Sequence, residues 1–320
     1  MIVAGDLGGT KSNLGAFELQ QGKLRLLTKK RFLSHHYSCA EDVIRAFVGD
    51  LDGKIAAACF DVAGPVADNI VQATNLPWVV DGKSLAGLLG VPQVPLLNDL
   101  EATGYGLQVL EPEDLEVLHE GTPVRANRAV IAAGTGLGET VLFWDGEQHV
   151  PRATEGGHAD FAPHTDMEID LLRHLMNKYG TVDCETLLSG RGFLEIHQFL
   201  DPKAQHPSFS DPNKDAAPEI TQRGLEGSCP VCVRTLDLWV GIYGSEAGNF
   251  ALRSLARGGM YVAGGIAVKI LPKLKDGRFT AALADKGKFR GFLSQIPVYV
   301  VLNEDAPLLG AAHVASRSMQ

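Results

Sequence analysis

Short apolar segments alternate along this chain with longer stretches in which apolar residues recur at helical spacing. The clearest predicted strands are residues 1–4, 54–62, 94–97, 129–132, 260–263 and 296–302. Most of them run into glycine, asparagine or another residue typical of turns. Because strands and helices alternate throughout, the pattern predicts an α/β protein. Ligands in such sheets bind where strands end and turns or helices begin.

Residues typical of helix starts precede several of the helical stretches. Ser38 and Glu41 have the spacing of a capping box, as do Thr165 and Glu168, so we expect a helix to begin beside each pair. Asp99 follows a predicted strand and is placed to cap the next helix. Helices are therefore expected to begin at these three positions.

The second half of the chain contains the longest amphipathic pattern, at 236–255. Residues 201–218 are rich in proline, serine, aspartate and lysine and are expected to form a mobile surface loop. A terminal helix is expected at 308–316. Cys229 and Cys232 form a C-x-x-C pattern, but no second ligand pair is spaced to match, which favours packing on a helix over zinc or redox chemistry.

A strand, a glycine turn and a returning strand occur early in the chain and again in the middle. The first copy covers residues 1–18 and the second covers 129–144. Two such units form a weak internal repeat. The sequence therefore predicts a duplicated domain in which each half contributes one glycine turn.

Composition narrows the possible functions. The chain has 320 residues with a net charge of −9, which disfavours general nucleic-acid binding. No apolar run reaches the length of a membrane span, so no membrane association is expected. Its five cysteines are scattered and odd in number, which indicates reduced thiols in a cytoplasmic protein. Glycine is in excess, at 36 residues. Because no Gly-X-Y repeat accounts for the excess, these glycines are expected in turns or where the backbone closely approaches another group.

Three glycine turns follow apolar strands, and their backbone N–H groups could surround phosphate oxygens. Thr10 and Thr135 add hydroxyl groups to two of them. Neither the P-loop pattern nor the Rossmann pattern is present. A single turn would be weak evidence, but three in one chain favour phosphate binding. The glycines concerned are Gly8, Gly9, Gly134, Gly136, Gly138, Gly264 and Gly265.

Two carboxylates lie where strands end. Asp6 could hold the water shell of Mg²⁺ beside a phosphate chain, or it could be an ordinary turn carboxylate. Asp99, after Asn98, could be a helix cap or the general base that phosphoryl transfer to an alcohol needs. The residues alone leave both choices open.

Polar residues of the second half could bind a sugar, whose hydroxyl groups need several donors and acceptors. Glu155, His158 and Glu185 supply them. His158 could instead be a structural histidine. With Asp160 and His164 it also forms an H-x-D-x-x-x-H pattern, which is not a known metal-ligand spacing.

In their order and spacing, these motifs resemble those of the bacterial glucokinases, in the hexokinase and actin-like superfamily. The matching segments are GDLGGT at 5–10, TN at 74–75, LLND at 96–99, AGTGLG at 133–138, EGGHADFAP at 155–163, ETLLSGRG at 185–192, AGGI at 263–266, and DKGKF followed by IPVY near the end. The resemblance implies a duplicated ribonuclease-H-like, two-domain sugar kinase with a central cleft. The small α/β domain would cover 1–107 and 298–320, and the large α+β domain would cover 108–297.

The resemblance also implies residue roles for an ATP-dependent glucokinase that phosphorylates the 6-hydroxyl of glucose. Asp99 would be the base, and Asp6 would hold Mg²⁺ through water. The cofactor ATP would contact Asp6, Gly8, Gly9, Thr10, Lys11, Gly134, Thr135, Gly136, Gly138, Gly264 and Gly265. Glucose would contact Asn75, Asn98, Asp99, Glu155, His158 and Glu185. A homodimer is the assembly that the resemblance suggests.

Two departures from the family pattern bear on these roles. Lys11 stands where the family usually has asparagine, and a leucine and a proline follow Asn75. A lysine there resembles the ROK kinases and sugar-responsive repressors, but the chain lacks the C-x-C-G-x-x-G-C zinc motif of that group. With a strand beginning near residue 2, no N-terminal helix-turn-helix is expected. A kinase for another hexose and a non-catalytic sugar sensor are the alternative functions.

Overall fold

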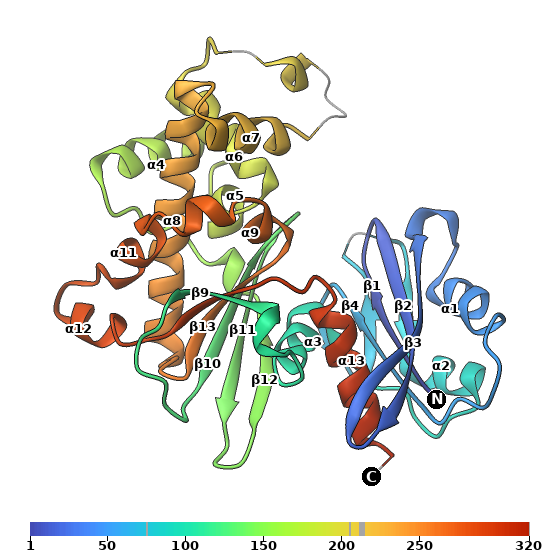
Figure 1. Ribbon diagram of the computed structural model, residues 1–320. Helices are drawn as coiled ribbons and strands as arrows, with labels where there is room; N and C mark the ends of the chain where they lie inside the picture. Colours follow the sequence, from blue (N-terminus) through green and yellow to red (C-terminus); the bar gives the residue numbers. More distant parts are fainter. Residues whose placement is uncertain (75, 205, 211–214, 320) are drawn as a thin grey trace. The chain divides into compact units, whose positions relative to one another are not determined.

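The computed structural model describes residues 1–74, 76–204, 206–210 and 215–319, which form two compact units (Figure 1). Unit 1 comprises Met1–Pro112 and Asn303–Gln320, and unit 2 comprises Glu113–Leu302. These boundaries lie a few residues beyond the predicted ones, for reasons visible in the hydrogen bonding. Val298–Val301 forms strand β14 of the unit 2 sheet, and residues 108–110 donate hydrogen bonds to the end of a unit 1 helix.

Unit 1 is built on a five-stranded sheet in the order β3-β2-β1-β4-β8. The strands are β1 (Ile2–Leu7), β2 (Lys11–Gln20), β3 (Lys23–Leu33), β4 (Ala57–Val62) and β8 (Leu96–Asn98). β1, β2 and β3 are antiparallel, whereas β1, β4 and β8 are parallel. The carboxyl ends of these parallel strands therefore meet at one edge of the sheet.

Helices cover both faces of this sheet, because β1 and β4 alternate apolar side chains between two cores. Val3 and Phe60 face α1 (Ala40–Val48) and α2 (Gly82–Leu89). Ile2 and Cys59 face α3 (Asp99–Gly106) and α13 (Ala306–Arg317). Figure 1 shows these two helix pairs on opposite sides of the sheet. A small sheet contains β5 (Val66–Ala67), β6 (Ile70–Gln72) and β7 (Val79–Asp81).

Unit 2 repeats this topology in a six-stranded sheet, in the order β12-β11-β10-β13-β14-β9. Its strands are β9 (Leu115–His119), β10 (Arg128–Ala133), β11 (Leu137–Trp144), β12 (His149–Thr154), β13 (Gly259–Ala263) and β14 (Val298–Val301). The first three in spatial order are antiparallel, and β10, β13 and β14 are parallel. Apart from β9, which is added antiparallel to β14, the strands match those of unit 1 in order and direction, which confirms the duplicated α/β fold.

The helices of unit 2 surround α8 (Pro230–Ser254), which runs lengthwise through the unit in Figure 1. Trp239 of α8 is fully buried and stacks on Phe193, with ring centroids 4.6 Å apart. The other helices are α4 (Asp166–Tyr179), α5 (Cys184–Leu187), α6 (Gly190–Leu200), α7 (Ala217–Glu226), α9 (Gly265–Lys269), α10 (Leu271–Leu274), α11 (Arg278–Ala284) and α12 (Arg290–Leu293). Short 3₁₀ turns occur in both units. Unit 1 contains η1 (Ser34–His36), η2 (Pro112–Asp114) lies at the boundary, and unit 2 contains η3 (Gly156–His158), η4 (Pro207–Ser210) and η5 (Gly287–Phe289). None of the helices described is long and apolar enough to cross a membrane.

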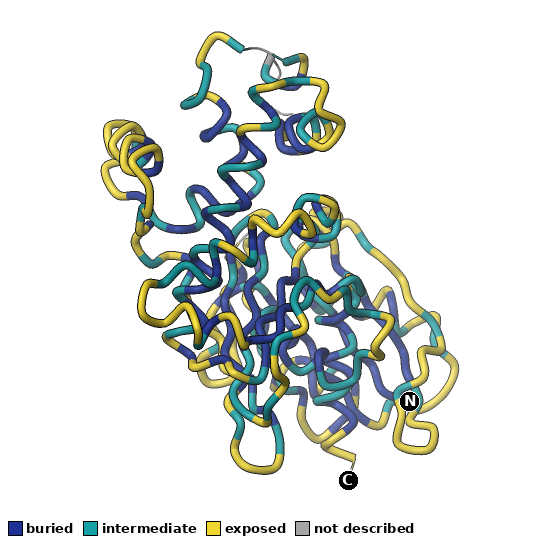
Figure 2. The backbone as a smooth tube through the Cα atoms, turned by 60° about the vertical axis from the view of Figure 1, so that its left-hand side comes forward, coloured by how far each residue is buried: buried dark blue, intermediate teal, exposed yellow. Residues whose placement is uncertain are grey.

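Local details differ from the sequence prediction, for example at strand β3 and at two helix caps. β3 was not predicted, because this edge strand is largely exposed and carries no clear apolar alternation. The cap of α1 is Cys39 rather than Ser38, and it makes no side-chain capping bond. The cap of α3 is Asn98 rather than Asp99, which is the first helical residue. Figure 2 shows the buried backbone concentrated in strands and inner helices, with loops exposed.

Candidate active site

Asp6 lies near the end of β1, next to the first glycine turn. It pairs in register with Asn13 of β2, whose Nδ2 donates to Asp6 Oδ2 at 3.0 Å. Burial raises the pKa of Asp6, while the Asn13 hydrogen bond partly offsets the rise. The turn that follows is held by Ser34, whose hydroxyl donates to the Gly8 carbonyl at 2.7 Å. Asp6 thus presents a partly desolvated carboxylate at the sheet edge. Carboxylate oxygens of this kind can coordinate Mg²⁺ directly or accept hydrogen bonds from its bound water.

Asp61 is a neighbour of Asp6 that the sequence analysis missed. It lies opposite Asp6 in the parallel pairing of β1 and β4 and is fully buried. Neither carboxylate oxygen has a hydrogen-bond partner among the described residues. Burial, with Asp6 and Asp99 close by, raises the pKa of Asp61 well above its ordinary value. A single aspartate within the apolar run AACFDV was the only available signal.

Asn98 and Asp99 lie where β8 passes into α3. Asn98 Oδ1 accepts hydrogen bonds from the backbone N–H groups of Leu100 and Glu101, at 2.9 and 3.4 Å. Its Nδ2 donates to the Gly64 carbonyl at 3.2 Å. Asn98 therefore has a structural role, which leaves the second N–H of its amide for a ligand. Because Asn98 provides the cap, the carboxylate of Asp99 is not needed for it.

In unit 2, the glycine turn between β10 and β11 is built around Glu185. Leu137 N donates to Glu185 Oε2 at 2.8 Å, and Gly134 N donates to the Gly136 carbonyl at 2.8 Å. A β-carbon at Gly136 would lie 2.3 Å from Glu185 Oε2, so a larger residue there would displace the Glu185 carboxylate. The structure thus places Glu185, which is predicted to bind the sugar, directly against the glycine turn that is predicted to bind phosphate.

His158 is oriented by Asp183, another residue that the sequence analysis missed. His158 Nδ1 lies 2.9 Å from Asp183 Oδ2, and Asp183 Oδ1 accepts from Thr186 N at 2.8 Å. The hydrogen bond to Asp183 raises the pKa of His158, and Glu185 and Glu155 add to the rise. Burial opposes ionisation of Asp183, but the bonds from Thr186 and His158 outweigh it and lower its pKa. His158 and Glu185 therefore share one region of unit 2, with Glu155 close enough to affect the charge of His158.

Glu139 lies in β11, beneath this region, and is almost fully buried. Burial is the main cause that raises its pKa to about 8, and the nearby Glu246 adds to the rise. Arg253 lowers the pKa of Glu139 and so partly offsets these two effects. Its Nη2 atom lies 3.6 Å from Glu139 Oε2 and also contacts Glu246. The turn at Gly156 packs directly on the Glu139 carboxyl group. A protonated acid thus supports the loop that carries His158.

The third glycine turn follows β13 and begins at Gly264. Gly264 has φ +87°, and a β-carbon there would lie 2.4 Å from the Ala133 carbonyl oxygen. Both features require glycine at this position. Since Ala132 and Ala263 are paired in the sheet, the third turn lies beside the second. Gly265 then begins α9.

The predicted site residues thus form two groups, each described within its own unit. In unit 1 they lie at the carboxyl ends of β1 and β8 and in the first glycine turn, and exposed Thr10 and Lys11 flank that turn. In unit 2 they surround the second and third glycine turns. Asn75 lies outside the described residues.

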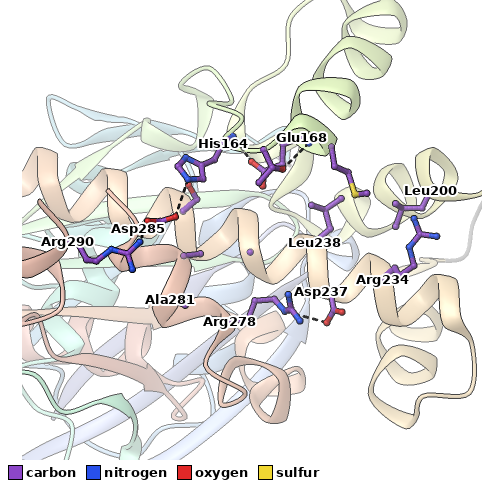
Figure 3. A pocket seen from close by; sticks show the side chains of 15 residues that line it. His164, Glu168, Leu200, Arg234, Asp237, Leu238, Arg278, Ala281, Asp285 and Arg290 are labelled. Atoms are coloured by element: carbon purple, nitrogen blue, oxygen red, sulfur yellow. Dashed lines mark hydrogen bonds and ion pairs between the residues drawn. The ribbon is translucent and has the colours of Figure 1, made fainter. Parts of the chain in front are cut away.

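A pocket of about 560 Å³ in unit 2 contains none of the predicted site residues (Figure 3). It lies among α4, α8 and α11, and Figure 3 shows His164 and Asp285 directed toward each other on one side. On another side Arg278 Nε lies 3.5 Å from Asp237 Oδ1. Two pairs of its charged lining residues, His164 with Asp285 and Arg278 with Asp237, contact each other, and none of the residues proposed for sugar or nucleotide lines the pocket.

Comparison with known proteins identifies the family. The family model described as glucokinase matches residues 3–318. A glucokinase of Synechocystis sp. is 38% identical over 349 residues, covering 99% of this chain and 98% of its own. A glucokinase of Nostoc sp. is 35% identical over 339 residues, covering 99% of both. The crystal structure of a glucokinase from an Antarctic psychrotroph superposes with a TM-score of 0.85 and 28% identity, covering 99% of this chain and 98% of the other. The chain belongs to the glucokinase family.

Proposed function

We propose that this protein transfers the γ-phosphoryl group of ATP to the 6-hydroxyl of glucose, with Asp99 as the general base. The observation that carries the proposal is the position of Asp99 at the first residue of α3, immediately after β8. The positive end of a helix dipole favours the charged form of a carboxylate at such a position. Asn98 provides the cap of this helix, so capping does not require the Asp99 carboxylate.

In the proposed reaction, a carboxylate oxygen of Asp99 takes the proton of the 6-hydroxyl as the sugar oxygen bonds to phosphorus. The bond between the γ-phosphorus and the bridging oxygen breaks, and ADP leaves with that oxygen. Mg²⁺, when bound, would neutralise charge on the phosphate chain, and Asp6 is the residue that we propose holds it through water.

We assign the backbone N–H groups of the glycine turns to the phosphates of ATP. Thr10, Thr135 and Lys11 flank these turns, and Gly264 and Gly265 are assigned to the adenosine. Unhindered N–H groups can stabilise charge that develops on transferring oxygens. The proposed nucleotide contacts are Asp6, Gly8, Gly9, Thr10, Lys11, Gly134, Thr135, Gly136, Gly138, Gly264 and Gly265.

We assign glucose to polar groups whose orientation the structure supports. His158 is held by Asp183, and Glu185 is held by the Leu137 N–H. Asn98 offers its remaining amide N–H. The proposed sugar contacts are Asn98, Asp99, Glu155, His158 and Glu185, together with Asn75. A hexose panel that compares kcat/KM tests the preference for glucose.

Replacement of Asp99 by asparagine tests the assignment of the base. Asp99→Asn keeps the shape of the side chain, so we expect kcat with glucose and ATP to fall by about 10² or more, with little change in KM for glucose. The matched control is Asp42→Asn, a half-buried acid in the first turn of α1 that pairs with Arg45. A coupled assay of ADP release measures both variants. If Asp99→Asn retains near-normal kcat, Asp99 is not the base.

We also propose a cytoplasmic homodimer that does not bind nucleic acid. The five cysteines are unpaired thiols, which suits a reducing compartment. The net charge of −9 disfavours a polyanionic partner. Light scattering on the purified chain of 34.2 kDa distinguishes one copy from two.

A further inference from the structure

Four side chains with metal-binding atoms converge in unit 2, away from the glycine turns. They are His197 of α6, His206 just before η4, Cys229 at the cap of α8 and Cys232 in its first turn. One ligand atom from each lies within 4.8 Å of those of the other three. The sequence predicts helix packing for the two cysteines, and Cys232 is indeed in the core, but no sequence pattern connects the two histidines with them.

The distances suit a tetrahedral ion. The His206 Nε2 atom lies 3.2 Å from Cys232 Sγ and 3.6 Å from Cys229 Sγ. In a tetrahedral zinc site, a sulfur at about 2.3 Å and a nitrogen at about 2.0–2.1 Å from the metal are about 3.6 Å apart. Only small side-chain adjustments are therefore needed for these three residues to share one ion.

His197 supplies an independent observation. Its side chain is fully buried, and neither ring nitrogen has a hydrogen-bond partner among the described residues. Its ring packs edge-on against His206 and Phe209, with centroids 5.1 and 5.0 Å away. An unpartnered imidazole in a core is destabilising, since buried polar groups normally find partners. A metal ion would satisfy one of these nitrogens.

We propose that His197, His206, Cys229 and Cys232 bind one zinc ion. Two sulfurs and two imidazole nitrogens in a tetrahedral arrangement favour zinc over magnesium or calcium, which prefer oxygen ligands. On binding, each thiol loses its proton to solvent, so the two thiolates neutralise the charge of the ion. Four protein ligands leave no open position, so the site is structural rather than catalytic.

The ion would tie three segments of unit 2 together. His197 lies near the end of α6, His206 lies in the segment after it, and the cysteines begin α8. Among the described residues of the segment between α6 and α7, Ser208 N donates to Glu219 Oε2 at 2.9 Å and Phe209 packs against the core. Zinc would hold this segment against the amino end of α8. The inference concerns a site separate from catalysis and does not depend on the proposed reaction.

Metal analysis of the untagged protein tests the proposal, since a histidine tag would bind zinc itself. After equilibration with zinc and gel filtration, we expect about one zinc per chain. His206→Ala should abolish stoichiometric binding without disturbing the core, because His206 is only half-buried. The matched controls are His174→Ala, an exposed histidine on α4, and Cys39→Ser in unit 1. Both controls should keep the zinc.

Cobalt substitution gives a spectroscopic readout of the ligands. Co²⁺ in the wild-type site should show intense visible bands typical of tetrahedral coordination and a thiolate charge-transfer band. Cys229→Ser should weaken the charge-transfer band, while Cys39→Ser should leave it unchanged. Should the cysteine variant fail to fold, mercurial titration of the wild-type thiols provides the same test, because it must release zinc in proportion to the thiols blocked.

Any of three results would overturn the proposal. One is a folded wild-type protein that retains fewer than about one zinc per ten chains after equilibration. Another is a disulfide between Cys229 and Cys232 in the freshly purified protein, seen as the loss of two thiols and two hydrogens in mass spectrometry. The third is zinc that persists in full in His206→Ala, which would show that the ion binds elsewhere.

Discussion

At the scale of single residues, the charge of His158 depends on one neighbour. Asp183 accepts a hydrogen bond from His158 Nδ1 and is itself held by the backbone and hydroxyl of Thr186. A histidine held in this way keeps one tautomer and one ring orientation. Asp183 is therefore a positioning residue for the proposed sugar contact of His158.

Asp183→Asn tests this role. Asparagine is also a good helix cap, so α5 should remain intact, but the lost charge should lower the pKa of His158 toward its ordinary value. We also expect KM for glucose to rise roughly tenfold, the effect of one weakened charged hydrogen bond. Histidine NMR titration and steady-state kinetics measure the two effects.

Asp285→Asn is the matched control for Asp183→Asn. Asp285 lies beside His164 in the same kind of pair, with 3.2 Å between Nε2 and Oδ2. That substitution should leave the titration of His158 unchanged. An unaltered His158 pKa in Asp183→Asn would contradict the positioning role.

At the scale of elements, the junction of β8 and α3 combines a cap with a proposed ligand. Asn98 Oδ1 caps the helix, while its amide nitrogen holds the Gly64 carbonyl and is proposed to contact glucose. The cap therefore does not require neighbouring Asp99, for which we propose the role of base. A small shift of this junction would move both residues together.

Two substitutions at Asn98 separate its functions. Asn98→Ala removes the cap and should lower the free energy of unfolding by about 1 kcal/mol. Asn98→Ser retains a capping oxygen and should be closer to wild type in stability, yet both variants lose the amide donor. We therefore expect a similar rise in KM for glucose in the two variants, measured beside denaturant unfolding. If instead the KM for glucose rises only in Asn98→Ala, the less stable variant, Asn98 serves only as the helix cap.

At the scale of the whole molecule, buried acids couple stability to pH. Burial raises the pKa of Glu139 to about 8, from an unfolded value of about 4.5. Below the unfolded value both states are protonated. As pH rises from about 4.5 to about 8, the unfolded chain releases this proton while the folded protein retains it, so folding becomes less favourable. Glu139 therefore stabilises the fold at low pH and loses that contribution across this window.

Glu139→Gln should remove this dependence, because glutamine approximates the protonated acid. We expect the variant to gain stability relative to wild type as pH rises from about 5 to about 8, by on the order of 1–3 kcal/mol. Thermal unfolding at several pH values measures the difference. Glu147→Gln, in an exposed hairpin, should show no such trend. A constant difference for Glu139→Gln across this range would contradict the raised pKa.

Sequence reasoning could identify the elements whose apolar periodicity and turn residues were clear. The glycine turns, the strand ends and the long helix at α8 follow from such local signals. The exposed strand β3 carried no such signal, since its stability comes from pairing with β2. Asp61 and Asp183 were missed because neither belongs to a motif, and the contacts of Asp61 with Asp6 and of Asp183 with His158 join segments distant in sequence.

By itself, the sequence determined the α/β class, the duplication and the order of the motifs that mark a glucokinase, because these depend on local periodicity and spacing. Only the tertiary structure decided how individual groups are used. It assigned the cap of α3 to Asn98, placed Glu185 against Gly136 and left Asp61 buried beside Asp6. It also brought His197 and His206 to the C-x-x-C pair. Burial, charge and metal ligation depend on contacts between segments far apart in the chain, and those contacts exist only after folding.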